Sequence, residues 1–276
     1  MNNGLFITDF DGTLLRSDGT LAQRDLEALE DLNRCGIKTA VATGRSLYSF
    51  RGSPGVDLPV DYIIFTTGAG AITQTEGKLL YACNLSTEMV ARALTFFKQS
   101  AFDFMLHYPV PENHHFFYRQ ASGNNTDFKT RLDRYRQFGK PLNSVSADGF
   151  REASQFLAVV PETETDDALA MVRSALPELS VIHTTSPLDH RSTWIELFHP
   201  DVSKSSTAAW LAAELDINQT KTMAVGNDYN DIDLLEWAAK SFVVENAPQD
   251  LKARFQTVAS NNDGGVADAI AQWIKK

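Results

Sequence analysis

Short apolar runs that each end in a polar turn recur along this chain, and they constrain its fold more than any other feature. The run at 5–8 (LFIT) ends in Asp9, and the run at 37–42 (IKTAVA) ends in Thr43. In the last third, the run at 222–225 (TMAV) ends in GNDYND. Helical patterns separate these runs. In the first of them Leu26, Leu29 and Leu32 share a face, Thr20 could cap the helix, and Gly36 would end it. Buried strands that alternate with amphipathic helices predict a parallel sheet covered by helices on both faces.

The middle of the chain follows a different pattern, rich in aromatic residues and histidine. Five of the six histidines lie between positions 107 and 190. Helical patterns occur at 87–100, 127–138 and 165–175, and strand-like runs at 102–107, 116–119, 155–160 and 194–198. This alternation is typical of an α+β domain. The sequence therefore predicts an α/β fold, with a Rossmann-like parallel-sheet core of residues 1–83 and 191–276 and an inserted α+β cap domain of residues 84–190.

Composition excludes several classes of partner. The formal net charge of −10 argues against a nucleic-acid ligand, which usually meets a basic patch. No apolar run approaches the about 20 residues that a membrane helix needs, and the first residues lack the basic flank and apolar core of a signal peptide. Cys35 and Cys83 make no metal-type spacing and suggest no disulfide scaffold. We expect a cytoplasmic enzyme without a membrane partner.

Asp9 and Asp11 stand one residue apart, directly after the first apolar run. Residues two apart on an extended chain face the same way, and two such carboxylates repel unless a cation lies between them or one holds a proton. Mg²⁺ is the usual cation for carboxylate and phosphate oxygens. One carboxylate can attack phosphorus to form an aspartyl-phosphate, while a second protonates the leaving oxygen and later activates water. The alternative is an ordinary surface turn, because Asp-Gly is a common turn pair.

Four further segments carry groups suited to a phosphoryl site. Gly12 and Thr13 offer backbone N–H groups that could cradle an anion. Thr43 brings a hydroxyl, or it caps a helix. Lys204 begins a helix, where a cation opposes the helix dipole and so favours a nearby anion; a solvated lysine is the alternative. GNDYND, at 226–231, offers metal ligands, or it forms a turn and helix cap.

Together these segments resemble the four motifs of the haloacid dehalogenase-like superfamily. In chain order they are DFDGT at 9–13, ATGR at 42–45, Lys204 within SKSS, and GNDYND at 226–231. Within that superfamily the chain resembles the Cof-type sugar phosphatases. This narrower resemblance lies in the size and position of the inserted domain, in TTGAGAI at 66–72, in IELFHPDVSK at 195–204, and in ENA and NNDGGVADAI near the C-terminus.

The resemblance implies a role for each matched residue. Asp9 is then the nucleophile and an Mg²⁺ ligand, and Asp11 is the general acid/base with its backbone carbonyl on the metal. Thr43 binds phosphate by its hydroxyl, and Lys204 neutralises the nucleophile and the phosphoryl group. The remaining positions expected to bind or support the phosphate are Gly12, Gly44 and Arg45.

The fourth motif departs from the family pattern, which usually reads Gly-Asp-x-x-Asn-Asp. Asn227 stands at its second position, and an acid follows at Asp228. Either Asn227 gives its amide oxygen to Mg²⁺ or Asp228 is the ligand, and the sequence leaves both open. Asp231 then supports the metal site indirectly or through water, with Asn230 beside it. Thr67 also stands where many relatives carry Asn.

These expectations combine into a Mg²⁺-dependent phosphoric monoester hydrolase. It would act on a small phosphorylated metabolite, such as a sugar phosphate, through an aspartyl-phosphate. A phosphomutase that uses the same intermediate and a non-catalytic sensor of a phosphate ligand are the alternatives. The physiological substrate and the oligomeric state stay open at this point.

Discrimination between substrates is expected in the inserted domain, because the core motifs meet only the phosphoryl group and the metal. The stretch MLHYPVPENHHFFYRQ, at 105–120, offers donors among aromatic rings. Its candidates are His107, His114, His115 and Arg119. The alternative is that these four residues are structural.

Overall fold

The chain divides into two compact units in the computed structural model, which describes residues 3–53, 57–144 and 151–274. The first unit contains Met1–Ala82 and Ser203–Lys276, and the second is Cys83–Val202. The sequence placed the return to the first unit at residue 191. That boundary is wrong: it lies too early by about one strand. β11 (Thr193–Phe198) pairs with β9 (Gln155–Val160) and β10 (Ser180–Thr185), so it belongs to the second unit. The outer limits of the predicted domains, residues 1 and 276, lie outside the described residues.

An eight-stranded sheet forms the centre of the first unit, in the order β14-β13-β12-β1-β2-β3-β4-β5. Its strands are β1 (Leu5–Asp9), β2 (Lys38–Ala42), β3 (Tyr62–Phe65), β4 (Gly70–Thr73), β5 (Leu79–Ala82), β12 (Thr222–Gly226), β13 (Lys240–Val244) and β14 (Gln256–Val258). All neighbours are parallel except the β3–β4 and β4–β5 pairs. The predicted parallel α/β sheet is therefore confirmed, although β4 and the edge strand β5, which are antiparallel to their neighbours, were not predicted.

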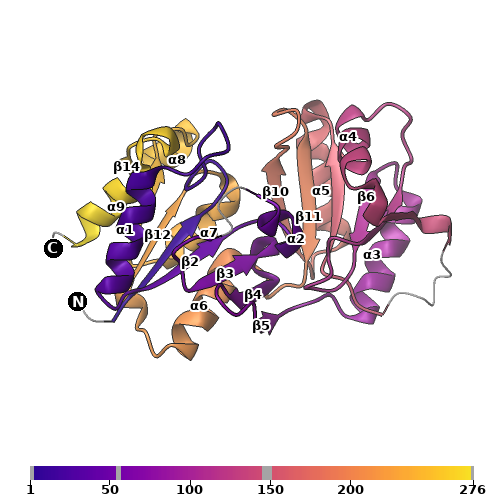
Figure 1. Ribbon diagram of the computed structural model, residues 1–276. Helices are drawn as coiled ribbons and strands as arrows, with labels where there is room; N and C mark the ends of the chain where they lie inside the picture. The colour runs from indigo at the N-terminus through magenta and orange to yellow at the C-terminus, as the bar shows by residue number, and fades with distance from the viewer. Residues whose placement is uncertain (1–2, 54–56, 145–150, 275–276) are drawn as a thin grey trace. The chain divides into compact units, whose positions relative to one another are not determined.

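Helices cover both faces of this sheet (Figure 1). They are α1 (Gln23–Arg34), α2 (Leu47–Arg51), α6 (Lys204–Glu214), α7 (Ile232–Trp237), α8 (Gln249–Arg254) and α9 (Gly265–Ile274). α6 and α7 pack on one face, where Leu211 and Leu234 meet Leu5 and Ile7 in one buried cluster. α1 and α9 pack together on the other face. No helix in the described ranges is long and apolar enough to cross a membrane.

The sheet order explains how distant residues come together. β1 lies between β12 and β2, and the three strands are parallel. Their carboxyl ends therefore meet at one edge, which is where open α/β sheets bind ligands. The polar turns after Asp9, Ala42 and Gly226 all lie at that edge.

The start of α1 differs from its prediction. Thr20 was expected to cap this helix, but its backbone N–H and its hydroxyl donate to Asp18, at 2.9 and 2.6 Å. The N-cap is Ala22, which makes no side-chain cap. The predicted end is close: Cys35 is the C-cap, and Gly36 follows with a φ of +73°.

The second unit contains a six-stranded sheet in the order β10-β11-β9-β6-β7-β8, with β6 (Asp103–His107), β7 (Phe116–Arg119) and β8 (Gly139–Pro141). All pairs are antiparallel except β7–β8. α3 (Thr87–Gln99) and α5 (Thr165–Ala175) pack on one face, and α4 (Thr126–Arg134) packs on the other. α4 ends earlier than its prediction because a 3₁₀ turn, Arg136–Phe138, replaces its last residues.

Asp25, on α1, is a buried carboxylate that the sequence analysis did not single out. Its side chain is 0% exposed, and its Oδ1 accepts the backbone N–H of Ala267 at 2.8 Å, in the first turn of α9. Its Oδ2 has no hydrogen-bond partner among the described residues. Burial raises the pKa of Asp25 to about 6, although the Ala267 N–H and the guanidinium groups of Arg24 and Arg16 oppose the shift.

We expect Asp25→Asn to stabilise the protein, by an amount that grows between pH 4 and 6. Below its unfolded pKa of 3.8, Asp25 is protonated in both states and contributes nothing. As pH rises to about 6, the unfolded chain releases this proton while the folded chain keeps it, so wild-type stability falls. The difference reaches at most about 3 kcal/mol. Urea unfolding of both proteins at several pH values measures it. A difference that stays constant from pH 4 to 7 would mean that Asp25 titrates normally.

Candidate active site

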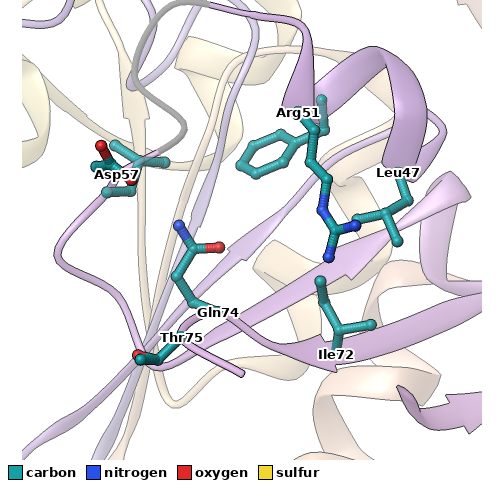
Figure 2. A pocket seen from close by; sticks show the side chains of 8 residues that line it. Leu47, Arg51, Asp57, Ile72, Gln74 and Thr75 are labelled. Atoms are coloured by element: carbon teal, nitrogen blue, oxygen red, sulfur yellow. The ribbon is translucent and has the colours of Figure 1, made fainter. Parts of the chain in front are cut away.

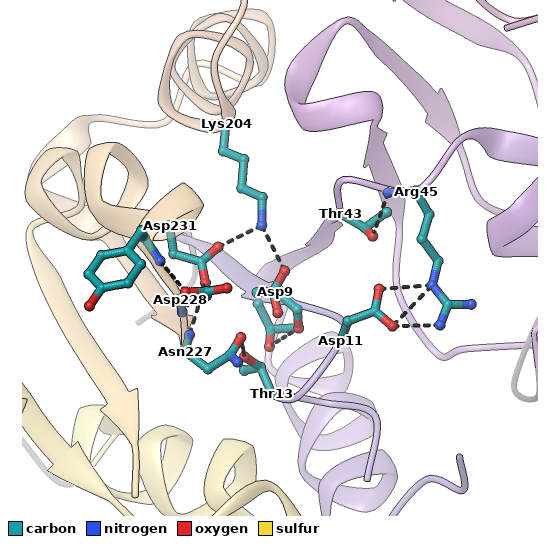
Figure 3. A network of polar contacts seen from close by, with 11 residues as sticks. Asp9, Asp11, Thr13, Thr43, Arg45, Lys204, Asn227, Asp228 and Asp231 are labelled. Atoms are coloured by element: carbon teal, nitrogen blue, oxygen red, sulfur yellow. Dashed lines mark hydrogen bonds and ion pairs between the residues drawn. The ribbon is translucent and has the colours of Figure 1, made fainter. Parts of the chain in front are cut away.

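Three buried charges meet at the edge of the first unit's sheet (Figure 3). Nζ of Lys204 lies 2.7 Å from Oδ1 of Asp9 and 2.6 Å from Oδ1 of Asp231. The side chains of Lys204 and Asp231 are 0% exposed, and that of Asp9 is 6% exposed. Two carboxylates therefore share one ammonium group, and the cluster carries one net negative charge when all three groups are ionised.

The burial of this cluster shifts the pKa of its members. Burial and the neighbouring Asp231 raise the pKa of Asp9 to about 7, against the opposing effect of Lys204. Burial alone would lower the pKa of Lys204, but Asp231 and Asp9 outweigh it and raise that pKa. Lys204 is therefore charged at neutral pH. A buried cluster with excess negative charge attracts a further cation.

The backbone around Lys204 fixes its direction. Lys204 is the first residue of α6, and Ser203 caps the helix by accepting the N–H of Ser206 at 3.1 Å. The turn after β3 packs against this end: Thr207 donates its hydroxyl to the backbone oxygen of Gly68 at 2.6 Å. Gly68 has a φ of +102°, and a Cβ there would lie 2.2 Å from the Ser203 oxygen, so only glycine fits.

The tip of the Asn227 side chain lies among oxygens of the first motif. One terminal atom of its amide is 3.0 Å from the backbone oxygen of Asp11, 3.1 Å from Oδ2 of Asp9 and 3.0 Å from Oγ1 of Thr13. With its nitrogen there, the amide donates to the two acceptors. With its oxygen there, the amide accepts the Thr13 hydroxyl and also meets the two acceptor oxygens, an arrangement that a cation would stabilise. Mg²⁺ binds oxygens at about 2.0–2.1 Å in an octahedron, which places adjacent ligand oxygens about 2.9 Å apart. The spacing around Asn227 fits that ion.

Asp228 has a different task. Its Oδ1 accepts the backbone N–H of Tyr229 at 2.8 Å, and it forms a reciprocal capping box with Asp231 at the 3₁₀ turn Tyr229–Asp231. Oδ2 of Asp231 accepts the backbone N–H groups of Asn227 and Asp228, at 2.9 and 3.1 Å. Burial raises the pKa of Asp228. Of the two alternatives that the sequence left open, the geometry therefore favours Asn227 as the group that faces Asp9.

Asp11 is paired with Arg45 rather than with the buried cluster. Nε of Arg45 lies 3.0 and 2.8 Å from the two carboxylate oxygens of Asp11, and Nη2 lies 2.5 Å from Oδ1. The Arg45 guanidinium also lies over the Phe10 ring, 5.2 Å from its centroid. Figure 3 shows this pair on the side of Asp9 away from Asp231. The side chain of Asp11 is 47% exposed, so a ligand can reach it.

Thr43 and Gly44 follow β2 at the same edge. Thr43 is buried, and its hydroxyl accepts the backbone N–H of Arg45 at 3.1 Å, which leaves the hydroxyl proton for a further acceptor. A Cβ at Gly44 would lie 3.6 Å from Oγ1 of Thr67 and 3.9 Å from Nδ2 of Asn230. Asn230 and Thr67 therefore border the phosphate-binding segment expected from the sequence.

The loop after β1 is held by residues near the C-terminus, whose contacts the sequence reasoning missed. Asn246 donates its side-chain amide to the backbone oxygen of Gly12 at 2.8 Å. The buried Asn261 donates to the backbone oxygen of Leu15 at 3.0 Å and its own N–H to Asn246 at 3.0 Å. Gly12 has a φ of +75°, and a Cβ there would lie 2.7 Å from Nδ2 of Asn227. The ENA and NNDGG motifs, recognised only by resemblance, thus brace this loop.

The four candidates of the second unit do not share one role. Arg119 donates from Nη1 to the backbone oxygens of Phe97, Lys98 and Ser100, at 2.7, 2.8 and 3.2 Å, so it holds the end of α3. His107 is buried, and its Nδ1 donates to the backbone oxygen of Asn113 at 2.7 Å. Burial and the nearby Arg131 lower the pKa of His107 to about 3. These two residues fit the structural alternative, whereas His114 and His115 lie together in the β6–β7 loop.

A separate pocket of about 330 Å³ lies in the first unit between α2 and β4 (Figure 2). Arg51 and Gln74 line it together with the apolar side chains of Leu47 and Ile72. Of the described lining residues, Ile72 ends the TTGAGAI segment, and the others lie outside the motifs of the sequence analysis. Asp57 is the only acidic side chain among its described lining residues, and these include no histidine or cysteine.

Comparison with known proteins places these motifs in one family. A family model described as haloacid dehalogenase-like hydrolase matches residues 6–270. The phosphatase YwpJ of Bacillus subtilis is 24% identical over 98% of this chain and 99% of its own length. The HMP-PP phosphatase of Cronobacter sakazakii is 25% identical over 96% of this chain and 94% of its own length.

Among solved structures, the HAD subclass IIB sugar phosphatase BT4131 has a similar fold. Its TM-score is 0.74 at 18% sequence identity, and the match covers 98% of both chains. At this identity the likeness concerns the fold alone. Together with the family model, it confirms the fold that the motifs implied.

Proposed function

The chain belongs to the haloacid dehalogenase-like hydrolases, and on that premise we propose that it is a Mg²⁺-dependent phosphatase of small phosphorylated metabolites. The reaction would pass through a phosphoryl group on Asp9. The observation that supports this proposal most is the cluster of Asp9, Lys204 and Asp231, which is buried and negatively charged at the carboxyl edge of a parallel sheet. A nucleophilic carboxylate, a fixed ammonium and a place for a divalent cation are the parts that phosphoryl transfer requires.

Each residue then has a defined task. The Asp9 carboxylate attacks the phosphorus, and Lys204 holds that carboxylate in place by its 2.7 Å contact while neutralising charge on the phosphoryl oxygens. Asp231 fixes Lys204 in turn, at 2.6 Å. The hydroxyl proton of Thr43 and the backbone around Gly44 bind the phosphoryl group from β2. Apart from the attack by Asp9, the protein contributes mainly by positioning the reacting groups and stabilising their charge.

Asp11 serves as general acid and then as general base. It protonates the leaving oxygen and later takes a proton from the water that hydrolyses the aspartyl-phosphate. Its carboxylate is engaged by Arg45 here. A substrate phosphate competes for the same guanidinium, since Arg binds carboxylate and phosphate alike. Transfer of Arg45 to the phosphate frees Asp11 for the leaving group.

Asp9, the backbone oxygen of Asp11 and the side-chain oxygen of Asn227 are the residues that would hold the metal. The Asn227 amide atom lies 3.0 Å from the Asp11 oxygen and 3.1 Å from Oδ2 of Asp9, which supports this assignment. Bound there, Mg²⁺ supplies positive charge to the attacking carboxylate and the phosphoryl oxygens. Asp228 holds the turn, and Asp231 orients both the turn and Lys204.

We expect Asn227→Ala to raise the Mg²⁺ concentration for half-maximal activity at least about tenfold, because the variant loses a metal ligand. Asp228→Ala should leave that concentration nearly unchanged and lower the unfolding free energy by about 1 kcal/mol, the usual value of a lost helix cap. Mg²⁺ titration of initial rates, with urea unfolding alongside, measures both effects. If Asp228→Ala alone changed the Mg²⁺ requirement, the ligand assignment would be reversed.

The leaving group is proposed to be a sugar or a similar small metabolite. Support comes from a relative named as an HMP-PP phosphatase and from the motifs that resemble those of the Cof-type sugar phosphatases. The proposal also includes a cytoplasmic setting and the second unit as the part that distinguishes substrates. A panel of sugar phosphates, nucleotides and vitamin phosphates, assayed with Mg²⁺ for phosphate release, tests the function. Phosphate release from none of them would refute a metabolite phosphatase, and isomerised phosphate esters without release would indicate a phosphomutase.

A further inference from the structure

Glu112, His114 and His115 form a cluster of potential metal ligands in the second unit, outside the site described above. One ligand atom from each residue lies within 4.8 Å of the others. Oε2 of Glu112 is 3.8 Å from Nε2 of His114, and the two histidine rings are 4.3 Å apart between centroids. Two imidazoles and one carboxylate are a common ligand set of zinc sites that keep a fourth position for water.

The loop that carries these residues is held in place on both sides. It connects β6 and β7, whose residues His107 and Phe116 are paired. Tyr108 donates its backbone N–H to His115 at 3.0 Å, and His115 donates its own to Glu112 at 3.0 Å. Val110 donates to Asn84 at 3.0 Å. The backbone of the cluster is therefore arranged before any ion binds, which lowers the entropic cost of binding.

Aromatic side chains surround the two imidazoles. Phe138 meets both rings edge-on, with centroid distances of 4.9 Å to His114 and 5.3 Å to His115. Tyr108 lies 5.6 Å from His115 on another side. The His114 side chain is only 15% exposed, whereas Glu112 is 67% exposed.

From this arrangement we infer that Glu112, His114 and His115 bind a first-row transition ion of the Zn²⁺ type, independently of the carboxylate site in the first unit. Tetrahedral Zn²⁺ places its ligand atoms about 3.3–3.5 Å apart. The separation of 3.8 Å between Oε2 of Glu112 and Nε2 of His114 is close to that value, and small rotations of the three side chains would complete the site. Imidazole ligands distinguish the site from the all-oxygen site around Asp9, since Mg²⁺ prefers oxygen donors. The bound ion ties the two ends of the segment 112–115 together.

Isothermal titration of the full chain with Zn²⁺, in excess Mg²⁺ to fill the carboxylate site, tests this inference. Wild type should bind one Zn²⁺ per chain. Since loss of even an outer partner of a metal typically weakens binding about 10–100-fold, His114→Gln, His115→Gln and Glu112→Gln should each weaken it at least about tenfold. His190→Gln, an exposed histidine of the same unit, is the matched control and should bind like wild type.

Thermal unfolding gives a second readout that does not depend on activity. Zn²⁺ should raise the melting temperature of wild type and of His190→Gln but not of the three ligand variants, because only an ion bound to the folded state stabilises it. Glu112→Gln changes an exposed side chain, so it keeps the comparison valid if a histidine variant folds poorly. Equal Zn²⁺ affinity in wild type and all three variants, loss of binding in Asp9→Asn instead, or no binding by wild type at micromolar Zn²⁺ would each overturn the site.

Discussion

Asp9→Asn should abolish turnover while leaving the fold intact. An amide cannot attack phosphorus. Asp231, the other carboxylate that contacts Lys204 among the described residues, cannot replace Asp9 because its second oxygen is held by the backbone N–H groups of Asn227 and Asp228. We expect kcat below about a hundredth of the wild-type value. Rapid quenching with a radiolabelled substrate should trap an acid-stable phosphoryl group on wild type and none on the variant.

The fold of Asp9→Asn should survive because the substitution removes the excess charge of the cluster. Lys204 keeps Asp231 at 2.6 Å, which leaves a neutral buried pair. Asp25→Asn is the matched control, since it makes the same change at another buried aspartate of the same unit and should retain activity. A variant at position 9 with more than about a hundredth of wild-type kcat would rule out nucleophilic catalysis by this residue.

Lys204→Met should damage stability as well as activity. Among the described residues, Lys204 supplies the only ammonium group that contacts the buried carboxylates of Asp9 and Asp231. Its loss leaves buried charge uncompensated, which typically costs about 3–5 kcal/mol. The unfolding free energy, from urea denaturation without metal, should fall by about that amount. Turnover should fall too, because the ammonium group that contacts the Asp9 carboxylate is lost.

Lys204→Met combined with Asp231→Asn separates charge from packing. The double variant leaves only Asp9 charged in the cluster, so it should recover part of the lost stability while staying inactive. A double variant that is no more stable than Lys204→Met would show that the loss arises from packing of the lysine side chain. Mg²⁺ should also stabilise Lys204→Met more than wild type, because the cation replaces part of the missing charge.

Much of this site could be predicted because its residues follow strand ends. Asp9 and Thr43 each come directly after an apolar run, and parallel strands bring such positions to one edge. Lys204 was recognisable from its place at the start of a helix. These inferences need only local patterns and the rule that parallel sheets align the ends of their strands.

Other features depend on contacts that no local pattern encodes. The choice between Asn227 and Asp228 rests on which side chain caps the turn, and that is a matter of backbone geometry. The strand Thr193–Phe198 was recognised as a strand, but its partners, β9 and β10, lie in the second sheet. A strand's sequence specifies burial much better than its partner. Arg119 was a candidate hydrogen-bond donor to the substrate, yet it donates to three backbone carbonyl oxygens.

The central position of β1 has a consequence for synthesis of the protein on the ribosome. One neighbour of β1 is β2, which is synthesised soon afterwards, but the other is β12, at Thr222–Gly226. The loop after β1 also needs Asn246 and Asn261, which are synthesised later still, for its hydrogen bonds. The second unit, by contrast, is the continuous segment Cys83–Val202 and depends on no later residue for its sheet. Since domains generally fold as units during translation, the second unit can complete its sheet first, and β1 stays paired on one side only until β12 has been synthesised.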